Sequence, residues 1–139
     1  MILVIRISGQ VEIPAKVEES LYQLKLRRKY AAVLLKESTA TEKILINLRN
    51  YVAYGKVSEE SLRKLIELRG QPLKRESKID AIKIIPHLGN KPMEELGLKP
   101  FFRLHPPRGG IESKRHFGVG KGVLGDNKEN INKLMERML

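Results

Sequence analysis

Two aliphatic segments separated by one amphipathic helix constrain the fold more than any other feature of the sequence. Residues 2–7 form a nearly unbroken aliphatic run, interrupted by Arg6, and residues 30–35 form a second such run. Runs of this kind are typical of strands buried on both faces of a sheet. Between them, after Pro14, apolar residues recur at helical spacing, namely Val17, Leu21 and Leu24. A strand–helix–strand crossover of this length predicts that the two strands pair in parallel.

The same alternation continues along the chain. Thr39 and Glu42 form a capping-box pattern that leads a second helix, and residues 51–57 follow as a third strand. Ser58 caps a third helix, which Gly70 closes. The predicted inward faces carry Ile44, Leu45 and Leu48 in the second helix and Leu62, Leu65 and Ile66 in the third. Strands that alternate with helices predict an α/β domain.

The remainder of the chain has weaker patterns. Residues 71–100 are expected to be irregular with helical patches, and residues 101–104 resemble a short strand. From Pro106 to Asp126 the chain is rich in glycine without apolar periodicity, which predicts a long loop of the functional or disordered kind. Asp126, with Glu129 three residues on, is expected to cap a final helix whose apolar residues are Ile131, Leu134, Met135 and Met138.

Length and charge narrow the class of protein. With 139 residues the chain suits one ordinary domain with a hydrophobic core. Its 27 Lys and Arg residues against 16 Asp and Glu residues give a net charge of +11, which favours nucleic acid as the partner and an anionic membrane surface second. The absence of cysteine excludes disulfides and thiol catalysis. The apolar N-terminal run is too short for a membrane span or signal peptide, so we expect a soluble cytoplasmic protein.

A first basic cluster follows the first predicted helix. It contains Lys25, Arg27, Arg28 and Lys29, and no acidic residue lies between Ser20 and Lys36. Uncompensated cations of this kind suit phosphate contacts, because each neutralised phosphate releases condensed counterions. The alternative interpretation is a solvated helix end, where cations also interact favourably with the helix dipole.

A second basic cluster occupies the predicted loop. Its cations are Arg103, Arg108, Lys114, Arg115 and Lys121, against Glu112 as the single carboxylate, and they are interleaved with the rings of His105, His116 and Phe117. Glycines allow the backbone to approach a phosphate chain closely, while rings can stack on unpaired bases. This combination favours folded RNA over plain duplex DNA. The alternative is a flexible tether with incidental charge.

The same loop contains a formal dinucleotide-binding match, in which Gly120, Gly122 and Gly125 have the G-x-G-x-x-G spacing. That motif requires a buried strand before it and a helix that opens within it, and the residues preceding Gly120 predict no strand. A P-loop is also absent, because Lys121 is followed by Gly122 and so does not form the Lys-Ser or Lys-Thr pair that the motif requires. A small nucleotide-dependent enzyme therefore remains only an alternative hypothesis.

Other catalytic or metal-binding patterns are missing from the sequence. His87, His105 and His116 are too scattered for metal-ligand spacing, and no G-x-S-x-G motif occurs. We therefore expect no enzymatic activity, no cofactor and no metal site.

Several stretches of the chain resemble the large-subunit ribosomal protein L-thirty family. They are residues 1–57, the motif FRLHPPRGG at 102–110, and the late GVLG followed by INKL. The resemblance is to the longer archaeal form, related to the eukaryotic L-seven protein. It implies a ferredoxin-like βαβαβ core over residues 1–57, a helical insertion over 58–100, and a basic RNA-binding loop with a C-terminal helix over 101–139.

The resemblance also implies a function. Members of the family are structural constituents of the large ribosomal subunit that bind 23S rRNA, contact 5S rRNA and neighbouring ribosomal proteins, and stabilise the rRNA fold without catalysis. By position, the family's basic segment falls on Arg27, Arg28 and Lys29, and its C-terminal RNA-binding loop on Arg103, Arg108, Lys114, Arg115 and Lys121. The residues alone predict an RNA-binding module, which leaves a free-standing regulator as a further alternative.

Overall fold

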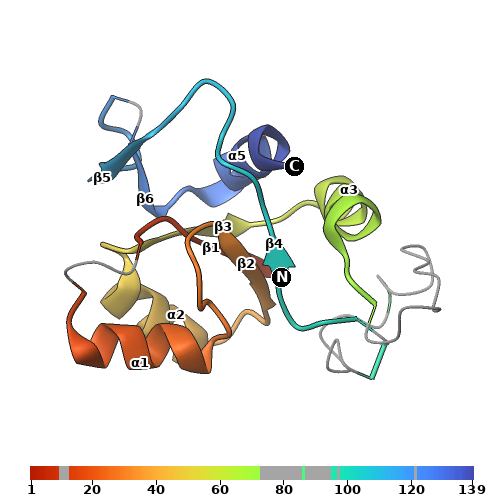
Figure 1. The fold of residues 1–139 in the computed structure, drawn as a ribbon, viewed down its shortest axis with the longest axis horizontal. Helices are drawn as coiled ribbons and strands as arrows, with labels where there is room; N and C mark the ends of the chain where they lie inside the picture. The colour runs from red at the N-terminus through yellow and green to blue at the C-terminus, as the bar shows by residue number, and fades with distance from the viewer. Residues whose placement is uncertain (10–12, 73–85, 87–94, 97, 121) are drawn as a thin grey trace.

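The computed structural model describes residues 1–9, 13–72, 86, 95–96, 98–120 and 122–139, and its centre is one mixed sheet (Figure 1). The strand order is β4-β2-β1-β3-β6-β5. In chain order the strands are β1 (Ile2–Arg6), β2 (Ala31–Leu35), β3 (Val52–Lys56), β4 (Phe102–Arg103), β5 (Glu112–His116) and β6 (Gly122–Asp126). The helices are α1 (Ala15–Gln23), α2 (Thr39–Leu48), α3 (Glu59–Arg69) and α5 (Ile131–Met138), the last preceded by the 3-10 turn η2 (Lys128–Asn130).

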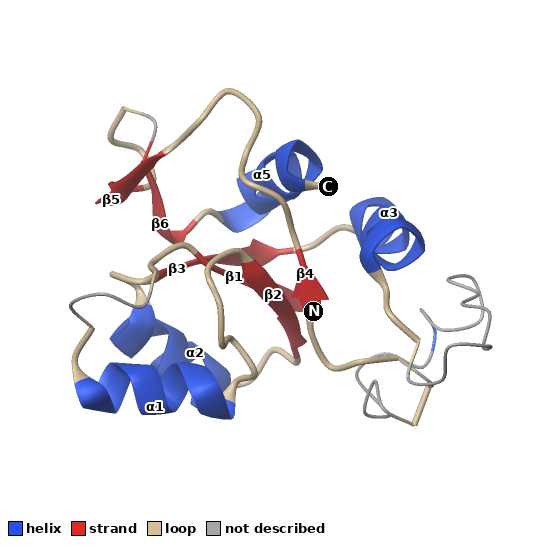
Figure 2. Cartoon of the chain, in the orientation of Figure 1, coloured by secondary structure: helices blue, strands red, loops and turns tan. Residues whose placement is uncertain are grey.

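The helices cover the sheet from both sides, with α1 and α2 on one face and α3 and α5 on the other (Figure 2). Strand β1 contributes to both cores, because Leu3 and Ile5 pack with α3 and α5 while Ile2 and Val4 pack with α1 and α2. The prediction of a strand buried on both faces is therefore confirmed. The mixed sheet with its layered helices also confirms the predicted ferredoxin-like α+β fold class.

The predicted parallel pairing of the first two strands is wrong. Strand β1 is antiparallel to both neighbours, with Ile5 opposite Ala32 in β2 and opposite Ala53 in β3. The reason lies in the connection after α1, which brings the chain back to the end of β1 that it left. There the amide of Tyr30 donates to the carbonyl oxygen of Arg6 at 2.7 Å. Crossover length alone does not determine strand direction when a connecting segment doubles back.

The predicted loop from 106 to 126 contains two strands, which corrects the loop prediction. Strand β6 pairs in parallel with β3, and β5 pairs with β6 at the edge of the sheet. The glycines that suggested a loop are needed for this pairing, since a Cβ on Gly122 would overlap the carbonyl oxygen of His116. Gly125 has φ +89°, a conformation that favours glycine.

The helix boundaries differ in detail from the predictions. Ser38, and not Thr39, caps α2, since its hydroxyl accepts a hydrogen bond from the amide of Thr41 at 3.1 Å. Ile44 is 41% exposed and not on the inward face, which Leu45 and Leu48 form. The Ser58 cap of α3 is confirmed, as is its buried face of Leu62, Leu65 and Ile66.

The C-terminal helix α5 buries the four predicted residues, Ile131, Leu134, Met135 and Met138. It starts later than predicted, because the carboxylate of Asp126 accepts from the amide of Lys128 at 2.8 Å and so caps the preceding turn. Most of the irregular segment predicted over 71–100 lies outside the described residues. Within the described part of the chain, no helix has the length and apolar character that a bilayer span requires.

Candidate nucleic-acid interface

Strand β4 brings the first predicted basic cluster together with Arg103, one member of the second cluster, at one edge of the sheet. It pairs antiparallel with β2, with Arg103 opposite Ala31, and the amide of Leu104 donates to the carbonyl oxygen of Tyr30 at 3.1 Å. The two segments enclose a pocket of about 420 Å³. Its lining residues are Lys25, Arg27, Arg28, Lys29, Tyr30, Ala31, Pro100, Phe101, Arg103 and Leu104. Residues some seventy positions apart in the sequence thus form one site.

The first basic cluster lies in a turn with a defined backbone conformation, and not at a helix end. Helix α1 ends at Gln23, so the four cations lie beyond its last turn. Lys25 has φ 68° and Tyr30 has φ 65°, left-handed conformations that are uncommon for residues other than glycine. Non-glycine residues persist in such conformations only when their surroundings hold them, and they concentrate at functional sites.

Arg6 holds this turn from inside the protein. The side chain is fully buried, and its guanidinium donates to the carbonyl oxygens of Leu26 at 2.8 Å, Ser8 at 3.0 Å and Gly9 at 3.0 Å. Burial lowers the pKa of Arg6, an effect partly offset by Glu18. The three bonds join the segment after β1 to the basic turn. Arg6 was not among the predicted site residues, although an arginine within an aliphatic strand is a readable signal of such a buried role.

Aromatic rings lie among the cations of the pocket. The ammonium of Lys29 lies 5.1 Å from the centroid of the Tyr30 ring, and the guanidinium carbon of Arg103 lies 5.6 Å from that of Phe101. Both distances fit cation–π contacts. None of the described residues that line the pocket is acidic. Sequence patterns did not identify Tyr30 and Phe101 as site residues, because each reads as part of a strand.

The loop after β4 is anchored on the C-terminal turn of α5. The amides of His105 and Arg108 donate to the carbonyl oxygens of Met138 at 2.9 Å and Arg137 at 3.0 Å. The guanidinium of Arg137 in turn donates to the carbonyl oxygens of Arg108, at 2.8 Å, and Gly110. These bonds satisfy backbone carbonyls that a helix end leaves without partners. The side chains of His105 and Arg108 are exposed, and neither lines the pocket.

The remaining predicted residues form a separate surface around β5 and β6. Arg115, His116 and Phe117 are exposed, and none of them lines the pocket between β2 and β4. His116 has a structural contact, since its Nε2 lies 2.9 Å from Oδ1 of Asn50. Phe117 lines a second pocket, of about 340 Å³, beside α5. The side chain of Lys114 and all of Lys121 lie outside what the structure describes.

The geometry excludes the dinucleotide interpretation of the glycine motif. Gly122 and Gly125 both lie within β6, whereas a dinucleotide fingerprint places its glycines at a turn from strand to helix. Among the described residues there is also no cluster of three or more His, Asp or Glu side chains that could hold a metal ion.

Comparison with known proteins supplies the family. No protein-family model matches the chain. The proteins called large ribosomal subunit protein uL30 are similar to it over almost its whole length: that of Aeropyrum pernix is 36% identical, over 98% of this chain and 97% of the relative. Those of Desulfurococcus amylolyticus and Archaeoglobus fulgidus are 34% and 33% identical, over 98% and 99% of this chain and 96% and 99% of the relatives. The chain therefore belongs to the uL30 family of large ribosomal subunit proteins.

Proposed function

We propose that this protein is a structural constituent of the large ribosomal subunit that binds 23S rRNA, contacts 5S rRNA and neighbouring ribosomal proteins, and stabilises the rRNA fold without catalysis. The family supports the ribosomal role. In this proposal residues 1–57 are the core, 58–100 an insertion and 101–139 the RNA-binding extension. The protein then resides in the cytoplasm, on the ribosome.

One observation carries the RNA-binding part of the proposal: the pairing of β2 with β4 gathers five cations around a pocket without a carboxylate. Concentrated positive charge attracts phosphates from a distance and releases their condensed counterions on contact. Arg6 holds the turn from Lys25 to Tyr30 through the carbonyl oxygen of Leu26, and this turn presents four of the five cations. RNA binding then has less chain to order than it would in a flexible tether.

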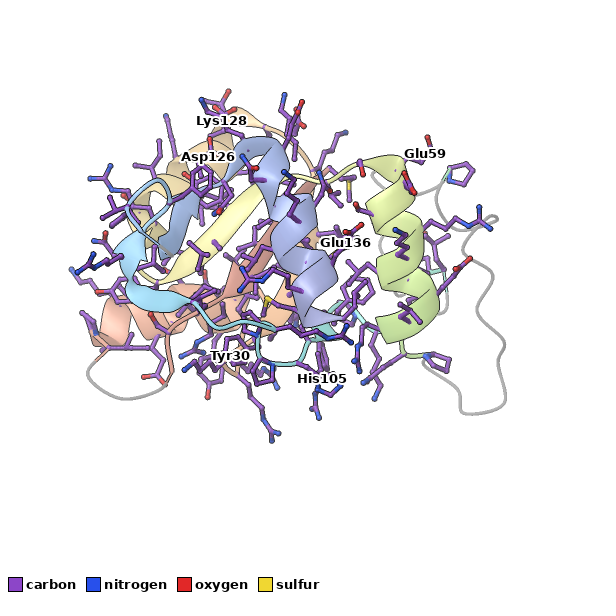
Figure 3. All side chains as sticks on the ribbon, turned by 90° about the horizontal axis from the view of Figure 1, so that it is seen from above. Tyr30, Glu59, His105, Asp126, Lys128 and Glu136 are labelled. Carbon is purple, nitrogen blue, oxygen red and sulfur yellow. The ribbon has the colours of Figure 1, made fainter. Side chains whose placement is uncertain are left out.

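The positions of two acidic residues indicate which side of the molecule the RNA would approach. Glu59 on α3 lies across the view from Tyr30 and His105, which lie along the opposite edge, and Glu136 lies where α5 faces α3 (Figure 3). Lys64 of α3 is paired with Glu136 at 3.2 Å, which lowers the effective charge of that side. We therefore expect an RNA phosphate chain to favour the β4 edge of the sheet over α3, where Arg63 and Lys64 pair with carboxylates.

Salt dependence of binding to large-subunit rRNA tests the electrostatic mechanism. The logarithm of the association constant should fall linearly with the logarithm of salt concentration. Alanine at Arg27, Arg28 and Lys29 together should make that slope shallower by about 2–3, since each lost phosphate contact contributes ~0.7–0.9. A matched control replaces Arg63 and Lys64 on α3, where both cations already pair with carboxylates. A flat salt response in the unmodified protein would refute the mechanism.

Sedimentation of cell lysate on a sucrose gradient tests the ribosomal role directly. Co-migration with large subunits is the expected result. A pool found only in the soluble fractions would favour a free-standing RNA-binding regulator. Calorimetric titration with NAD and ATP addresses the remaining alternative, and we expect no saturable binding of either.

A further inference from the structure

The pocket between β2 and β4 has apolar walls as well as a basic rim. Tyr30, Ala31, Phe101 and Leu104 line it together with the cations. Phosphate neutralisation alone requires only exposed charge, so the apolar lining calls for a second kind of contact. We propose that this pocket holds a single unstacked nucleotide of the bound RNA, with its base against the aromatic and guanidinium groups and its phosphates against the rim. This inference rests on the proposed function, because the nucleotide belongs to that RNA.

The size of the pocket fits one nucleotide. A volume of about 420 Å³ is at the lower end of the range for small-molecule sites, roughly 300–1,000 Å³, and is too small for a base pair with its two backbones. Proteins that recognise RNA by sequence take bases from loops and bulges, which are already unstacked. A single bulged nucleotide therefore has the dimensions and the accessibility that the pocket requires.

The stacking partners are in place within the pocket. Phe101 with Arg103, and Tyr30 with Lys29, are ring–cation pairs at 5.6 Å and 5.1 Å. Bases stack on aromatic rings and also on the guanidinium plane of arginine. The planar guanidinium of Arg103 can therefore enlarge the surface on which a base stacks. The ammonium of Lys29 contributes charge but has no planar face for stacking.

Hydrogen bonds within the protein hold the wall of the pocket. Arg6 donates to the carbonyl oxygen of Leu26 at 2.8 Å, the amide of Tyr30 donates to the carbonyl oxygen of Arg6, and the amide of Leu104 donates to that of Tyr30. These bonds join the basic turn to β1 and to the segment after β4. A wall held in this way loses less conformational entropy on binding, which favours a defined ligand over non-specific adsorption.

An acidic peptide from a neighbouring protein is the competing occupant. It would satisfy the basic rim, but carboxylate side chains would leave the Phe101 and Tyr30 faces without a flat partner. A nucleotide satisfies both features, because it combines a π-face with phosphates.

The experiment compares two RNA hairpins of identical stem sequence, one fully paired and one with a single extra unpaired adenosine. Full-length protein should bind the bulged hairpin at least about fivefold more tightly, because stacking of one base on an aromatic side chain contributes roughly that factor or more. A third hairpin with an abasic site at the bulge should bind like the paired one, since it keeps the backbone distortion and loses the base.

Two conservative variants assign the preference to the pocket. Phe101→Leu removes the ring, and Arg103→Lys removes the guanidinium plane while keeping the charge. Both should abolish most of the preference, so that the bulged and the paired hairpin bind each variant with affinities within about twofold of one another. Arg63→Lys is the matched control, because Arg63 is exposed on α3 and outside the pocket lining, and it should keep the preference. Circular dichroism verifies that each variant is folded.

The outcomes separate this inference from the proposed function. Salt-dependent binding of both hairpins with equal affinity would overturn the nucleotide pocket and leave rRNA binding intact. Loss of salt-dependent binding altogether would overturn the proposed function. Displacement of the bulged hairpin by hexaglutamate at lower concentration than by a short oligoadenylate would overturn the nucleotide in favour of an acidic peptide.

Discussion

Replacement of Arg6 by methionine should destabilise the protein more than any substitution of an exposed arginine. Methionine keeps an unbranched side chain of similar length but donates no hydrogen bond. The carbonyl oxygens of Leu26, Ser8 and Gly9 would then lose their guanidinium donors. The segment after β1 and the basic turn would lose their connection through the interior.

The size of the effect follows from how buried each bond is. The bond to Leu26 is buried, so leaving this carbonyl oxygen without a donor lowers the free energy of unfolding by about 1–3 kcal/mol. The bonds to Ser8 and Gly9 are part-buried, and water can replace their donor, so each contributes about 0.5–1 kcal/mol. Removal of a buried charge recovers some desolvation energy. We expect a net loss of about 2–3 kcal/mol in the free energy of unfolding.

Urea denaturation followed by circular dichroism measures this loss. For a small domain, with an m value of about 1–3 kcal/mol per molar urea, the midpoint should fall by roughly 1–2 M. Arg28→Met is the control, because Arg28 is exposed in the same turn and its replacement should change stability by less than about 0.5 kcal/mol. Equal midpoints for the two variants would refute the structural role of Arg6.

RNA binding by the Arg6→Met variant distinguishes a positioning role of Arg6 from direct contact of Arg6 with the RNA. Arg6 is buried and lies outside the lining of the pocket, so it cannot neutralise a phosphate itself. At low temperature, where the variant is folded, the preference for a bulged hairpin should decrease. The slope of affinity against salt should remain that of the unmodified protein. A shallower slope would mean that Arg6 reaches the RNA.

Three further predictions concern other parts of the fold. Gly55→Ala should destabilise by about 1–3 kcal/mol, measured by thermal denaturation, because its Cβ would overlap the backbone oxygen of Lys128; unchanged stability would contradict the packing of β3 on η2. Ser58→Ala should cost about 1 kcal/mol in urea denaturation through loss of the α3 cap, and no loss would contradict the cap. Burial, with a smaller effect of Asp126, raises the pKa of Tyr54, so stability that is present below the usual tyrosine pKa should be lost as pH rises through the raised value. Phenolate absorbance should show a downward shift of that pKa in Asp126→Asn; an unchanged titration would contradict the coupling.

Much of the architecture could be predicted because its causes are local. The aliphatic run of β1, the Ser58 cap and the apolar face of α5 are each visible within a few residues, and each is present in the structure. The direction of β2 and the strand β6 could not be predicted in this way. Strand direction depends on where in space the connecting segment ends, which local sequence does not specify. The glycines of β6 are typical of a loop in the sequence, and only the structure shows the backbone that packs against Gly122.

The candidate site likewise has features that the sequence predicts and features that only the structure shows. Charge is a property of composition, so the basic residues at 25–29 and 103 were identifiable as a possible interface without any structure. The sequence alone thus determined an α/β domain, and it predicts a polyanion as the partner and the cations that would contact it. Only the tertiary structure decided that Arg103 joins the distant cluster at 25–29 around one pocket, that Tyr30 and Phe101 line it, and that Arg6 supports it from within. The physical reason is that pairing of β2 with β4 and burial of a guanidinium are long-range contacts, which no local pattern specifies.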